Sequence, residues 1–227
     1  MRAALESGRL QEIYDRAAAY YDVWHGLATA RSDQRGRRML VDRCVAPGDR
    51  VLDAGGGTGR TTALAARAVG AQGAVVLVDF SPGMVRGAVT RLADPALRRR
   101  VSVEIGDILH LPFDDGAFDV VLSTYSLCPL ADPVAGATEM YRVLKPGGLL
   151  GVAHSSEPRN AFVRWMADGV ERVIWRLPQF SLGCRSVSVL PDLVRAGAET
   201  VFDRRIGVPL WPFHVFAVRK PAAAGRA

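Results

Sequence analysis

Short apolar runs alternate with longer amphipathic segments through the middle of the chain. The runs rich in branched residues predict five strands, over residues 50–54, 74–79, 101–105, 118–123 and 149–154. Apolar positions at helical spacing between these runs predict helices over residues 61–69, 82–92 and 133–144. Strands that alternate with helices favour a parallel sheet covered on both faces, so we expect a doubly wound α/β core.

The pattern changes on both sides of this core. Residues 10–24 predict a helix in front of it. Behind it, the sequence predicts helices over residues 161–176 and 191–196 and strands over residues 199–203 and 214–219. No internal repeat or low-complexity linker divides the sequence, so we expect one domain over residues 1–227, with 221–227 as a frayed tail.

Composition limits the class of protein. Of the 227 residues, 49% are apolar and 23% are charged, which is close to the average globular domain. The apolar runs are far shorter than a membrane span, and the first residues lack the apolar segment of a signal peptide, so we expect a soluble, cytoplasmic protein. Cys44, Cys128 and Cys184 are too widely spaced for a disulfide framework or a zinc ribbon. We therefore expect reduced thiols and no metal.

The net charge of +6 comes almost entirely from arginine, because Lys145 and Lys220 are the only lysines. A basic protein can attract nucleic acid or anionic lipid. The arginines are dispersed, however, and lack the interleaved aromatic residues of single-strand binders. We therefore expect a solvated basic surface and no nucleic-acid partner, with at most peripheral contact to a membrane.

A glycine-rich segment follows the first predicted strand, where an open α/β sheet binds its ligands. The dinucleotide pattern Gly-x-Gly-x-x-Gly fails in both registers, because Arg60 or Thr62 stands in place of its last glycine. A phosphate-binding Gly-Lys-Ser/Thr is also absent from the sequence. The segment instead has the pattern Asp-x-Gly-x-Gly-x-Gly, formed by Asp53, Gly55, Gly57 and Gly59.

Three further segments follow in order: Val-Asp-Phe-Ser-Pro-Gly-Met at 78–84, Gly-Asp-Ile-Leu-His-Leu-Pro-Phe at 106–113, and Glu-Met-Tyr-Arg-Val-Leu-Lys-Pro-Gly-Gly at 139–148. With the glycine segment, they resemble the class I S-adenosylmethionine-dependent methyltransferases over roughly residues 50–155. The resemblance implies a Rossmann-like, mostly parallel, seven-stranded sheet with an antiparallel last strand and helices on both faces. It also implies S-adenosylmethionine as cofactor and S-adenosylhomocysteine as product.

The resemblance implies that Asp79 accepts hydrogen bonds from the ribose hydroxyls, that Asp107 meets the adenine amino group and that Ile108 flanks the ring. Chemistry supports carboxylates here, since S-adenosylmethionine offers a diol, amines and a sulfonium but no phosphate. Asp53 can hold the methionine ammonium together with the backbone. Taken singly, each acid is equally explained as a helix cap or loop acid. The other residues expected at the cofactor are Ala54, Gly55, Gly57, Gly59, Phe80, Met84, Ser123 and Tyr14.

Residues 14–22, Tyr-Asp-Arg-Ala-Ala-Ala-Tyr-Tyr-Asp, resemble the Tyr-Asp-x-x-Ala-x-x-Tyr-Asp segment of ubiquinone/menaquinone biosynthesis methyltransferases. Tyr14 and Tyr21 are seven residues apart and would share one helix face. The resemblance implies a lid that Tyr14 brings onto the cofactor, whereas packing of the aromatic rings on the core is the alternative. We accordingly assign residues 1–44 to lid helices, 45–156 to the cofactor core, and 157–220 to a substrate-side cap and the last strands.

The acceptor side gives weaker signals. Residues 123–130, Ser-Thr-Tyr-Ser-Leu-Cys-Pro-Leu, depart from the asparagine-containing sequence of quinone methyltransferases. Tyr125 and His154 are our candidate catalytic residues, and His154 could take a proton from the acceptor. A base is optional because positioning alone accelerates an in-line methyl transfer. The alternatives are a structural role for His154 and a core thiol for Cys128.

We therefore expect an S-adenosylmethionine-dependent methyltransferase that acts on a small or lipid-like acceptor. A quinone-precursor ring carbon is the first expectation, and a phospholipid amine or a thiol are alternatives. Other interpretations are a protein of this fold that binds S-adenosylmethionine without methylating, and a nicotinamide oxidoreductase. The apolar, arginine-flanked helix at 161–176 would cover the acceptor or touch a membrane surface. The oligomeric state is left open.

Overall fold

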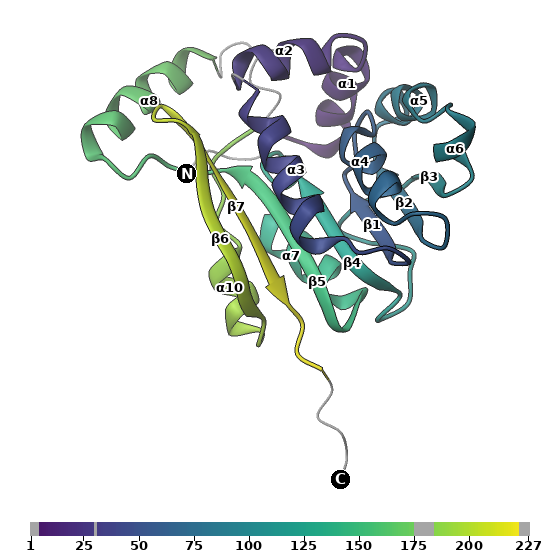
Figure 1. Cartoon of the computed structure of the whole chain (residues 1–227). Helices are drawn as coiled ribbons and strands as arrows, with labels where there is room; N and C mark the ends of the chain where they lie inside the picture. The colour runs from purple at the N-terminus through teal and green to yellow at the C-terminus, as the bar shows by residue number, and fades with distance from the viewer. Residues whose placement is uncertain (1–4, 30, 175–183, 223–227) are drawn as a thin grey trace.

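A twisted sheet runs through the centre of the molecule (Figure 1). The structure, a computed structural model, describes residues 5–29, 31–174 and 184–222. Within these residues, seven strands form the sheet in the order β3-β2-β1-β4-β5-β7-β6. Their bounds are Arg50–Ala54 (β1), Ala74–Asp79 (β2), Val101–Ile105 (β3), Phe118–Thr124 (β4), Leu144–Ser155 (β5), Glu199–Val208 (β6) and Trp211–Arg219 (β7).

The sheet is mostly parallel, as expected. Strand β1 pairs in parallel with both β2 and β4, whereas β7 runs antiparallel to both β5 and β6. The expected antiparallel last strand is therefore confirmed. The strand order reverses between β1 and β4, where Asp53 pairs with Leu122. Ligands of open α/β sheets bind at such a switch point, beyond the carboxyl ends of the strands.

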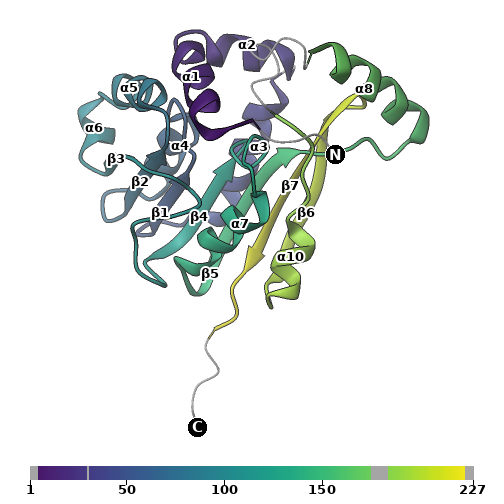
Figure 2. The ribbon, with the colours of Figure 1, turned by 180° about the vertical axis from the view of Figure 1, so that it is seen from behind.

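Helices cover both faces of the sheet (Figures 1 and 2). One face carries α3 (Ser32–Cys44), α4 (Arg60–Ala68) and α5 (Pro82–Arg91), and the short α6 (Pro95–Arg98) packs beside α4 and β3. The other face carries α7 (Pro133–Arg142) and α10 (Leu190–Arg195). Helices α1 (Ser7–Ala17) and α2 (Tyr21–Ala28) lie at the carboxyl ends of the parallel strands, and α8 (Ala161–Ile174) projects from the same end (Figure 1).

Side chains at the helix starts explain why these helices begin where the sequence predicts. The Ser81 hydroxyl accepts the Met84 N–H at 3.1 Å, and Pro82 occupies the first turn of α5. Asp132 accepts two N–H groups at the start of α7, from Val134 and Ala135. Such caps satisfy amide groups that have no partner within the helix.

The structure differs from the predicted elements in several places. The helix expected over 10–24 is two helices, although residues 18–20 between them contain neither glycine nor proline. Strand β5 begins at Leu144, whereas the sequence predicted a strand from residue 149. The pairing of β5 with β4 includes a register irregularity that accommodates the residues before Leu149. Helix α3 was not predicted individually. Residues 175 and 176 of the expected cap helix, and 223–227 of the expected tail, lie outside the described residues.

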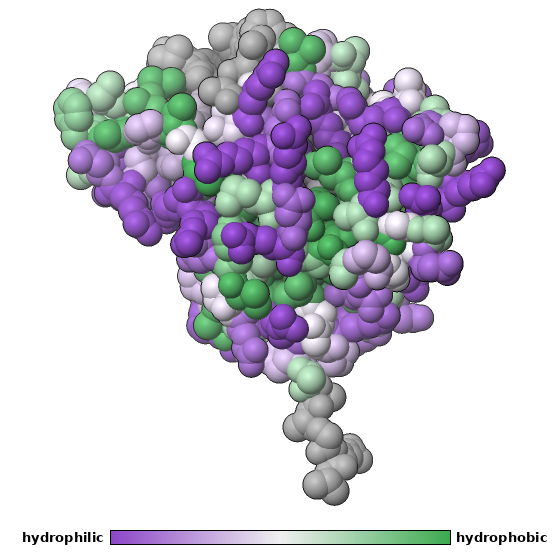
Figure 3. Space-filling model, viewed as in Figure 1, coloured by the Kyte–Doolittle hydropathy of each residue, from purple (hydrophilic) through white to green (hydrophobic). Residues whose placement is uncertain are grey.

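Helix α8 turns several apolar side chains toward solvent, and Figure 3 shows them as a green surface at the upper left. Phe162 and Trp165 are each 66% exposed, and their rings stack with 5.9 Å between centroids. Whether this surface covers an acceptor or touches a membrane stays a prediction. None of the described helices is long and apolar enough to cross a bilayer.

Candidate functional site

A glycine loop crosses the edge of the sheet at the switch point, between the end of β1 at Ala54 and the start of α4 at Arg60. Gly55 has a φ of +71°, and a Cβ atom there would collide with Ser126 and lie 2.9 Å from Ile108 Cδ1. A side chain at position 55 is therefore both strained and without space. Glycine lets the backbone pass close to the loops that follow β3 and β4.

The loop borders a narrow pocket of about 50 Å³, whose wall includes parts of α1, α2 and α3 and the ends of β2 and β4. The expected site residues that line it are Tyr14, Gly55, Gly57, Asp79, Phe80, Met84, Ile108 and Tyr125. Small-molecule sites typically measure roughly 300–1,000 Å³. Protein side chains therefore fill most of the crevice in this conformation.

The other expected residues lie behind or beside this wall; they are Asp53, Ala54, Gly59, Asp107, Ser123 and His154. Ala54 and Ser123 support the wall through Ser126, whose hydroxyl donates to the Ala54 carbonyl at 3.0 Å and lies 2.6 Å from the Ser123 hydroxyl. Gly59 is the N-cap of α4, with a φ of +78°. These three residues shape the loop from beneath.

Asp79 lies at the end of β2 and joins that strand to the glycine loop. Its Oδ1 accepts the N–H of Ser81 at 3.0 Å, and its Oδ2 accepts the N–H of Gly57 at 2.9 Å. Burial raises the pKa of this carboxyl from 3.8 to about 6, although the two backbone hydrogen bonds lower it. A carboxylate oxygen has about two acceptor positions, so each Asp79 oxygen keeps one for a ligand.

Asp53 is completely buried beneath the glycine loop. Its Oδ2 accepts the Thr62 hydroxyl at 2.6 Å, whereas its Oδ1 has no hydrogen-bond partner among the described residues. Burial raises the pKa of Asp53 to about 6, and Thr62 and Arg37 act in the opposite direction. A buried acceptor without a partner is rare and calls for an explanation, and a cationic ligand group near the loop would provide one.

Asp107 differs from the other two acids. Its side chain is 53% exposed, and its Oδ1 accepts the N–H of Leu109 at 2.9 Å. This geometry fits the alternative role given for Asp107 above, that of an acid whose hydrogen bond stabilises its own loop. The neighbouring Ile108 is buried and lines the pocket.

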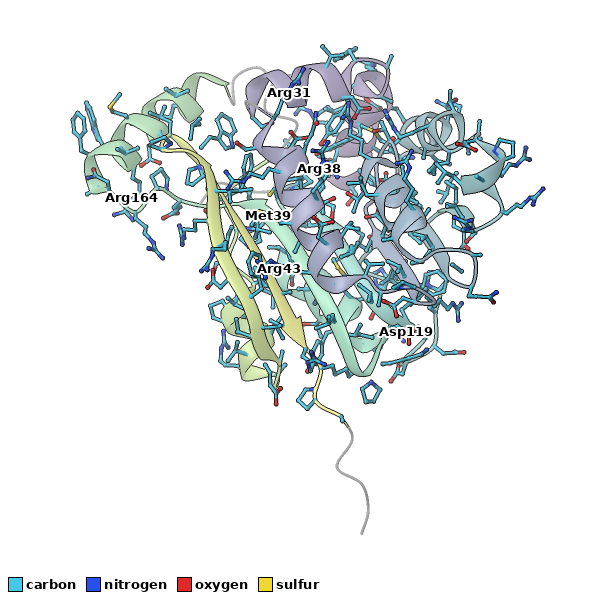
Figure 4. All side chains as sticks on the ribbon, viewed as in Figure 1. Arg31, Arg38, Met39, Arg43, Asp119 and Arg164 are labelled. Carbon is cyan, nitrogen blue, oxygen red and sulfur yellow. The ribbon has the colours of Figure 1, made fainter. Side chains whose placement is uncertain are left out.

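Arg37 of α3 also lines the pocket, and the sequence analysis missed it. Its Nη1 donates to the hydroxyls of Thr61 at 2.7 Å and Thr124 at 2.5 Å, and its Nε has no hydrogen-bond partner among the described residues. Arg31, Arg38 and Arg43 lie on the outside of the same region in Figure 4, whereas Arg37 is buried.

The sequence does contain a signal for this burial. Arg37 stands in one helical stripe with Leu40, Val41 and Cys44, all of which face the core. An arginine within an apolar stripe is placed inward, and a buried arginine needs polar partners or a ligand.

Tyr125, a candidate catalytic residue, lines the pocket with its ring, but its hydroxyl points away from it. The hydroxyl donates to the Asp33 carbonyl at 3.3 Å, and the ring packs edge-on against Phe213. Burial raises the pKa of the phenol well above its ordinary value, so it stays protonated and is unsuited to act as a base. The geometry favours a packing role.

His154, the other candidate catalytic residue, does not line the pocket. Its ring is fully buried, lies edge-on to His214 and Phe216, and has its Nδ1 2.9 Å from the Ser155 carbonyl. Burial lowers its pKa to about 4. This burial favours the structural alternative, although the ring Nε2 has no hydrogen-bond partner among the described residues, and a role of His154 as a base stays a prediction. Cys128 likewise fits its structural alternative, since its buried sulfur accepts the Ser155 N–H at 3.2 Å.

In each of the two Tyr-Asp pairs of the N-terminal segment, the tyrosine and the aspartate contact different parts of the molecule. Tyr14 and Tyr21 both line the pocket, with 6.0 Å between their ring centroids, and Tyr14 also packs against Phe80. The aspartates instead contact the start of α5 and the glycine loop. Asp15 accepts the Ser81 hydroxyl at 2.6 Å, and Asp22 accepts the Thr58 hydroxyl at 2.8 Å.

The described residues contain no cluster of three or more histidine, cysteine, aspartate or glutamate side chains that could hold a metal ion. The pocket is lined by the carboxylate of Asp79, the buried guanidinium of Arg37 and the backbone of the glycine loop, and the carboxylate of Asp53 lies beneath that loop. Such a mixture suits a ligand that carries hydroxyls, an ammonium and a carboxylate.

Comparison with known proteins assigns this arrangement to a family. Residues 51–148 match a family described as a methyltransferase domain. The ubiquinone/menaquinone biosynthesis C-methyltransferase UbiE of Teredinibacter turnerae is 34% identical over 169 residues, which are 74% of this chain and 68% of that protein. The demethylmenaquinone methyltransferase of Clavibacter sepedonicus is 38% identical over 169 residues, 72% of this chain and 66% of that protein. For UbiE of Vibrio campbellii, 36% identical over 66% of this chain, the match spans only 58% of the relative.

Solved structures share the fold. The (4+2)-cyclase SpnF has a TM-score of 0.77 at 21% identity, covering 98% of this chain and 99% of its own. A geranyl diphosphate C-methyltransferase from Streptomyces coelicolor, in complex with S-adenosyl-L-homocysteine, has a TM-score of 0.66 at 17% identity, covering 82% and 76%. At these identities the likeness establishes the fold and nothing about the reaction.

Proposed function

Because the chain belongs to the S-adenosylmethionine-dependent class I methyltransferases, we propose that it transfers the methyl group of this cofactor to a ring carbon of a quinone precursor. One observation carries the proposal: the two lid tyrosines, the glycine loop and Asp79 meet at one pocket at the switch point of the sheet. The names of the relatives support the acceptor class. The cytoplasm is the location that we propose.

The residues of the pocket fit the cofactor. When bound, the cofactor supplies a methyl group on a positively charged sulfonium. The free acceptor positions on Asp79 match the two ribose hydroxyls, one on each carboxylate oxygen. The apolar side chains of Phe80, Met84 and Ile108 offer walls for the adenine ring. Asp107 would reach the adenine amine only by giving up its hydrogen bond to Leu109.

Two buried charges suit the zwitterionic methionine end of the cofactor. Among the described residues, Asp53 has an acceptor oxygen without a hydrogen-bond partner beneath the loop. Arg37 lines the pocket, and its Nε makes no hydrogen bond to a described residue but lies 3.9 Å from the buried Asp33 Oδ2. We propose that Asp53, acting with the backbone of residues 54–57, attracts the ammonium and that Arg37 binds the carboxylate. Hydrogen bonds to charged groups are worth about 1.5–3 kcal/mol each, which is enough to orient this end of the molecule.

The acceptor side of the pocket contributes positioning. Leu10, Tyr125, Pro129 and Leu130 form an apolar wall that suits a flat ring. Because His154 is turned into the core and Tyr125 is bound to α3, neither is placed to accept a proton. We propose that acceleration comes from holding the ring carbon in line with the methyl group, which can contribute as much as about 7–11 kcal/mol.

The narrowness of the pocket implies that the lid moves. The space of about 50 Å³ is well below the roughly 300–1,000 Å³ of a typical small-molecule site, and a nucleoside with a methionine side chain needs a site of that size. We propose that α1 and α2 lift from the sheet edge to admit the cofactor and then close over it.

The experiment is methyl transfer from radiolabelled S-adenosylmethionine to a panel of acceptors: a demethylated naphthoquinol, phosphatidylethanolamine and a small thiol. We expect label in the quinol, bound through carbon and stable to acid. Label in the lipid amine or the thiol would replace the proposed acceptor with one of its alternatives.

Calorimetry separates the remaining interpretations. Binding of S-adenosylhomocysteine without transfer to any acceptor would favour a protein of this fold that does not methylate. Binding of NADH without binding of S-adenosylhomocysteine would overturn the cofactor assignment. Asp42→Asn, at an exposed position of α3, is the matched control for the site variants.

A further inference from the structure

Among the side chains that the structure describes, an apolar contact and two aspartates join the lid to the rest of the molecule, together with the Tyr14 hydroxyl near Cys184 Sγ. The apolar contact consists of Leu10, Tyr14 and Met84, with Phe80 and Tyr21 at its margin. The aspartates, Asp15 and Asp22, each follow directly after one of the two pocket-lining tyrosines. Hydrogen bonds to a charged group are worth about 1.5–3 kcal/mol each, so the two aspartates can contribute substantially to the attachment of the lid.

Asp15 attaches α1 to the start of α5. Its Oδ1 accepts both the hydroxyl of Ser81 at 2.6 Å and the N–H of Gly83 at 2.7 Å. Gly83 is required here, because a Cβ atom would lie 2.8 Å from the Asp15 backbone. The N–H of the same Ser81 donates to Asp79. One serine therefore connects the lid to the carboxylate proposed to bind the ribose.

Asp22 attaches α2 to the glycine loop and its surroundings. Its Oδ1 accepts the Thr58 hydroxyl at 2.8 Å and forms an ion pair with Arg60, whose Nε lies 2.8 Å away without hydrogen-bond geometry. Its other oxygen pairs with Arg91 of α5, whose Nε also donates to the Thr58 carbonyl at 2.8 Å. Thr58 stands between the two loop glycines Gly57 and Gly59. Asp22 is thus bonded to the segment that would lie under the cofactor.

The two attachments differ in charge and exposure. The partners of Asp15 are neutral, whereas Asp22 faces two arginines at the rim of the site, where the Arg60 and Arg91 side chains are 28% and 36% exposed. Salt screens ion pairs at such a rim and leaves hydrogen bonds between an acid and neutral groups much less affected. The attachment through Asp22 should therefore depend on ionic strength.

We propose that Asp22, held by Arg60 and Arg91, is a positioning residue that latches the lid tyrosines over the bound cofactor. Opening the lid breaks these ion pairs, and closing it restores them, so the latch sets how long the cofactor stays bound. Asp15 provides the second, salt-insensitive attachment. The inference rests on the proposed function only for the identity of the ligand.

The test measures the dissociation rate of S-adenosylhomocysteine from the full chain by stopped-flow displacement, at low and high salt. For Asp22→Asn we expect dissociation to be roughly tenfold faster or more, since charge-assisted hydrogen bonds are lost. We also expect the salt dependence seen in the unmodified chain to disappear. Asp15→Asn should dissociate faster too, but keep the salt dependence. Asp42→Asn, an exposed aspartate of α3, should behave as the unmodified chain.

Hydrogen exchange over residues 7–28 gives a second readout that does not need the ligand, with faster exchange expected in Asp22→Asn. An unchanged dissociation rate in a folded Asp22→Asn variant would overturn the latch, as would an unchanged salt dependence. If Asp22→Asn does not fold, the paired variant Arg60→Gln with Arg91→Gln tests the same ion pairs. No methyl acceptor is used, so a failure to methylate a quinol would leave this result standing, and failure of the latch would leave methyl transfer untouched.

Discussion

The amide of Gly57 donates a hydrogen bond of 2.9 Å to Asp79 Oδ2 and so joins the glycine loop of β1 to the end of β2. The two expected features of the site, a bare backbone turn and an acid on the neighbouring strand, are therefore one hydrogen-bonded unit. A ligand that binds to Asp79 therefore binds to a carboxylate whose position is defined by its hydrogen bond to the glycine loop.

Replacing Asp79 with alanine should weaken binding of S-adenosylhomocysteine by roughly ten- to two-hundredfold, because it removes charge-assisted hydrogen bonds to the ribose. Calorimetry of the purified variant measures this loss. Asp107→Ala is the comparison, since Asp107 is half-exposed and bonded to its own loop. Its effect should be much smaller, and equal losses in the two variants would contradict the difference in role.

Replacing Asp53 with asparagine should change how stability depends on pH. The folded chain raises the pKa of Asp53 from 3.8 to about 6, so the folded state holds this proton more tightly than the unfolded state. Stability is therefore lost as pH rises through this interval, by about 3 kcal/mol for this one buried group. The Asp53→Asn variant lacks that loss.

Urea unfolding of both proteins at pH 4 and pH 7 provides the measurement. The unfolding free energy of Asp53→Asn relative to the unmodified chain should be higher at pH 7 than at pH 4. Asp42→Asn should show no such trend. Parallel pH curves for Asp53→Asn and the unmodified chain would show that Asp53 is not a strained, buried carboxyl.

Replacing Arg37 with methionine should affect one end of the ligand only. Methionine fills a similar space, and Thr61 and Thr124 keep each other as partners at 2.7 Å. Asp33 loses its ion pair with Arg37 but keeps the Thr29 hydroxyl at 2.9 Å, so we expect the variant to fold with lower stability. If Arg37 binds the carboxylate, affinity for S-adenosylhomocysteine should fall roughly tenfold or more. Affinity for methylthioadenosine, which has no carboxylate, should stay the same. Equal losses for the two ligands would assign Arg37 a purely structural role.

Replacing His154 with glutamine should leave catalysis nearly intact. A general base contributes about 10²–10⁴-fold, so a decrease in kcat of less than about tenfold would exclude that role. We expect the pH dependence of kcat to be unchanged and the unfolding free energy to fall by about 1–3 kcal/mol, because the ring packs in the core. A hundredfold loss of kcat in a folded variant would restore His154 as a catalytic candidate.

The sequence predicted the cofactor half of the fold in detail, because its strands are short and rich in branched residues, and β1 and β2 are almost completely buried. The predicted bounds of β1, β2 and β3 agree with the structure, and the pocket contains most of the residues expected around the glycine loop. Local patterns of this kind depend on periodicity and turn residues, which the sequence displays directly.

The errors concern tertiary placement. His154 and Ala153 are neighbours on β5 and so face opposite sides of the sheet, and which side leads to the pocket depends on the elements packed there. Arg37 becomes part of the site only because α3 packs beside β4. The closeness of the lid to the loop, and hence the small pocket, also depends on contacts between distant segments. Of these relationships, only the burial of Arg37 has a local signal, the apolar stripe in which it stands, and that signal does not show which pocket the side chain reaches.

Position 55 has no room for a side chain, which limits how the loops of this scaffold can be exchanged. Ser126, which a Cβ atom there would strike, belongs to the segment proposed to border the acceptor, whereas Gly55 belongs to the segment proposed to border the cofactor. A chimera that imports the acceptor segment of a relative would have to import the matching glycine turn with it. Attempts to redirect this scaffold to new acceptors should therefore exchange the two segments as a pair.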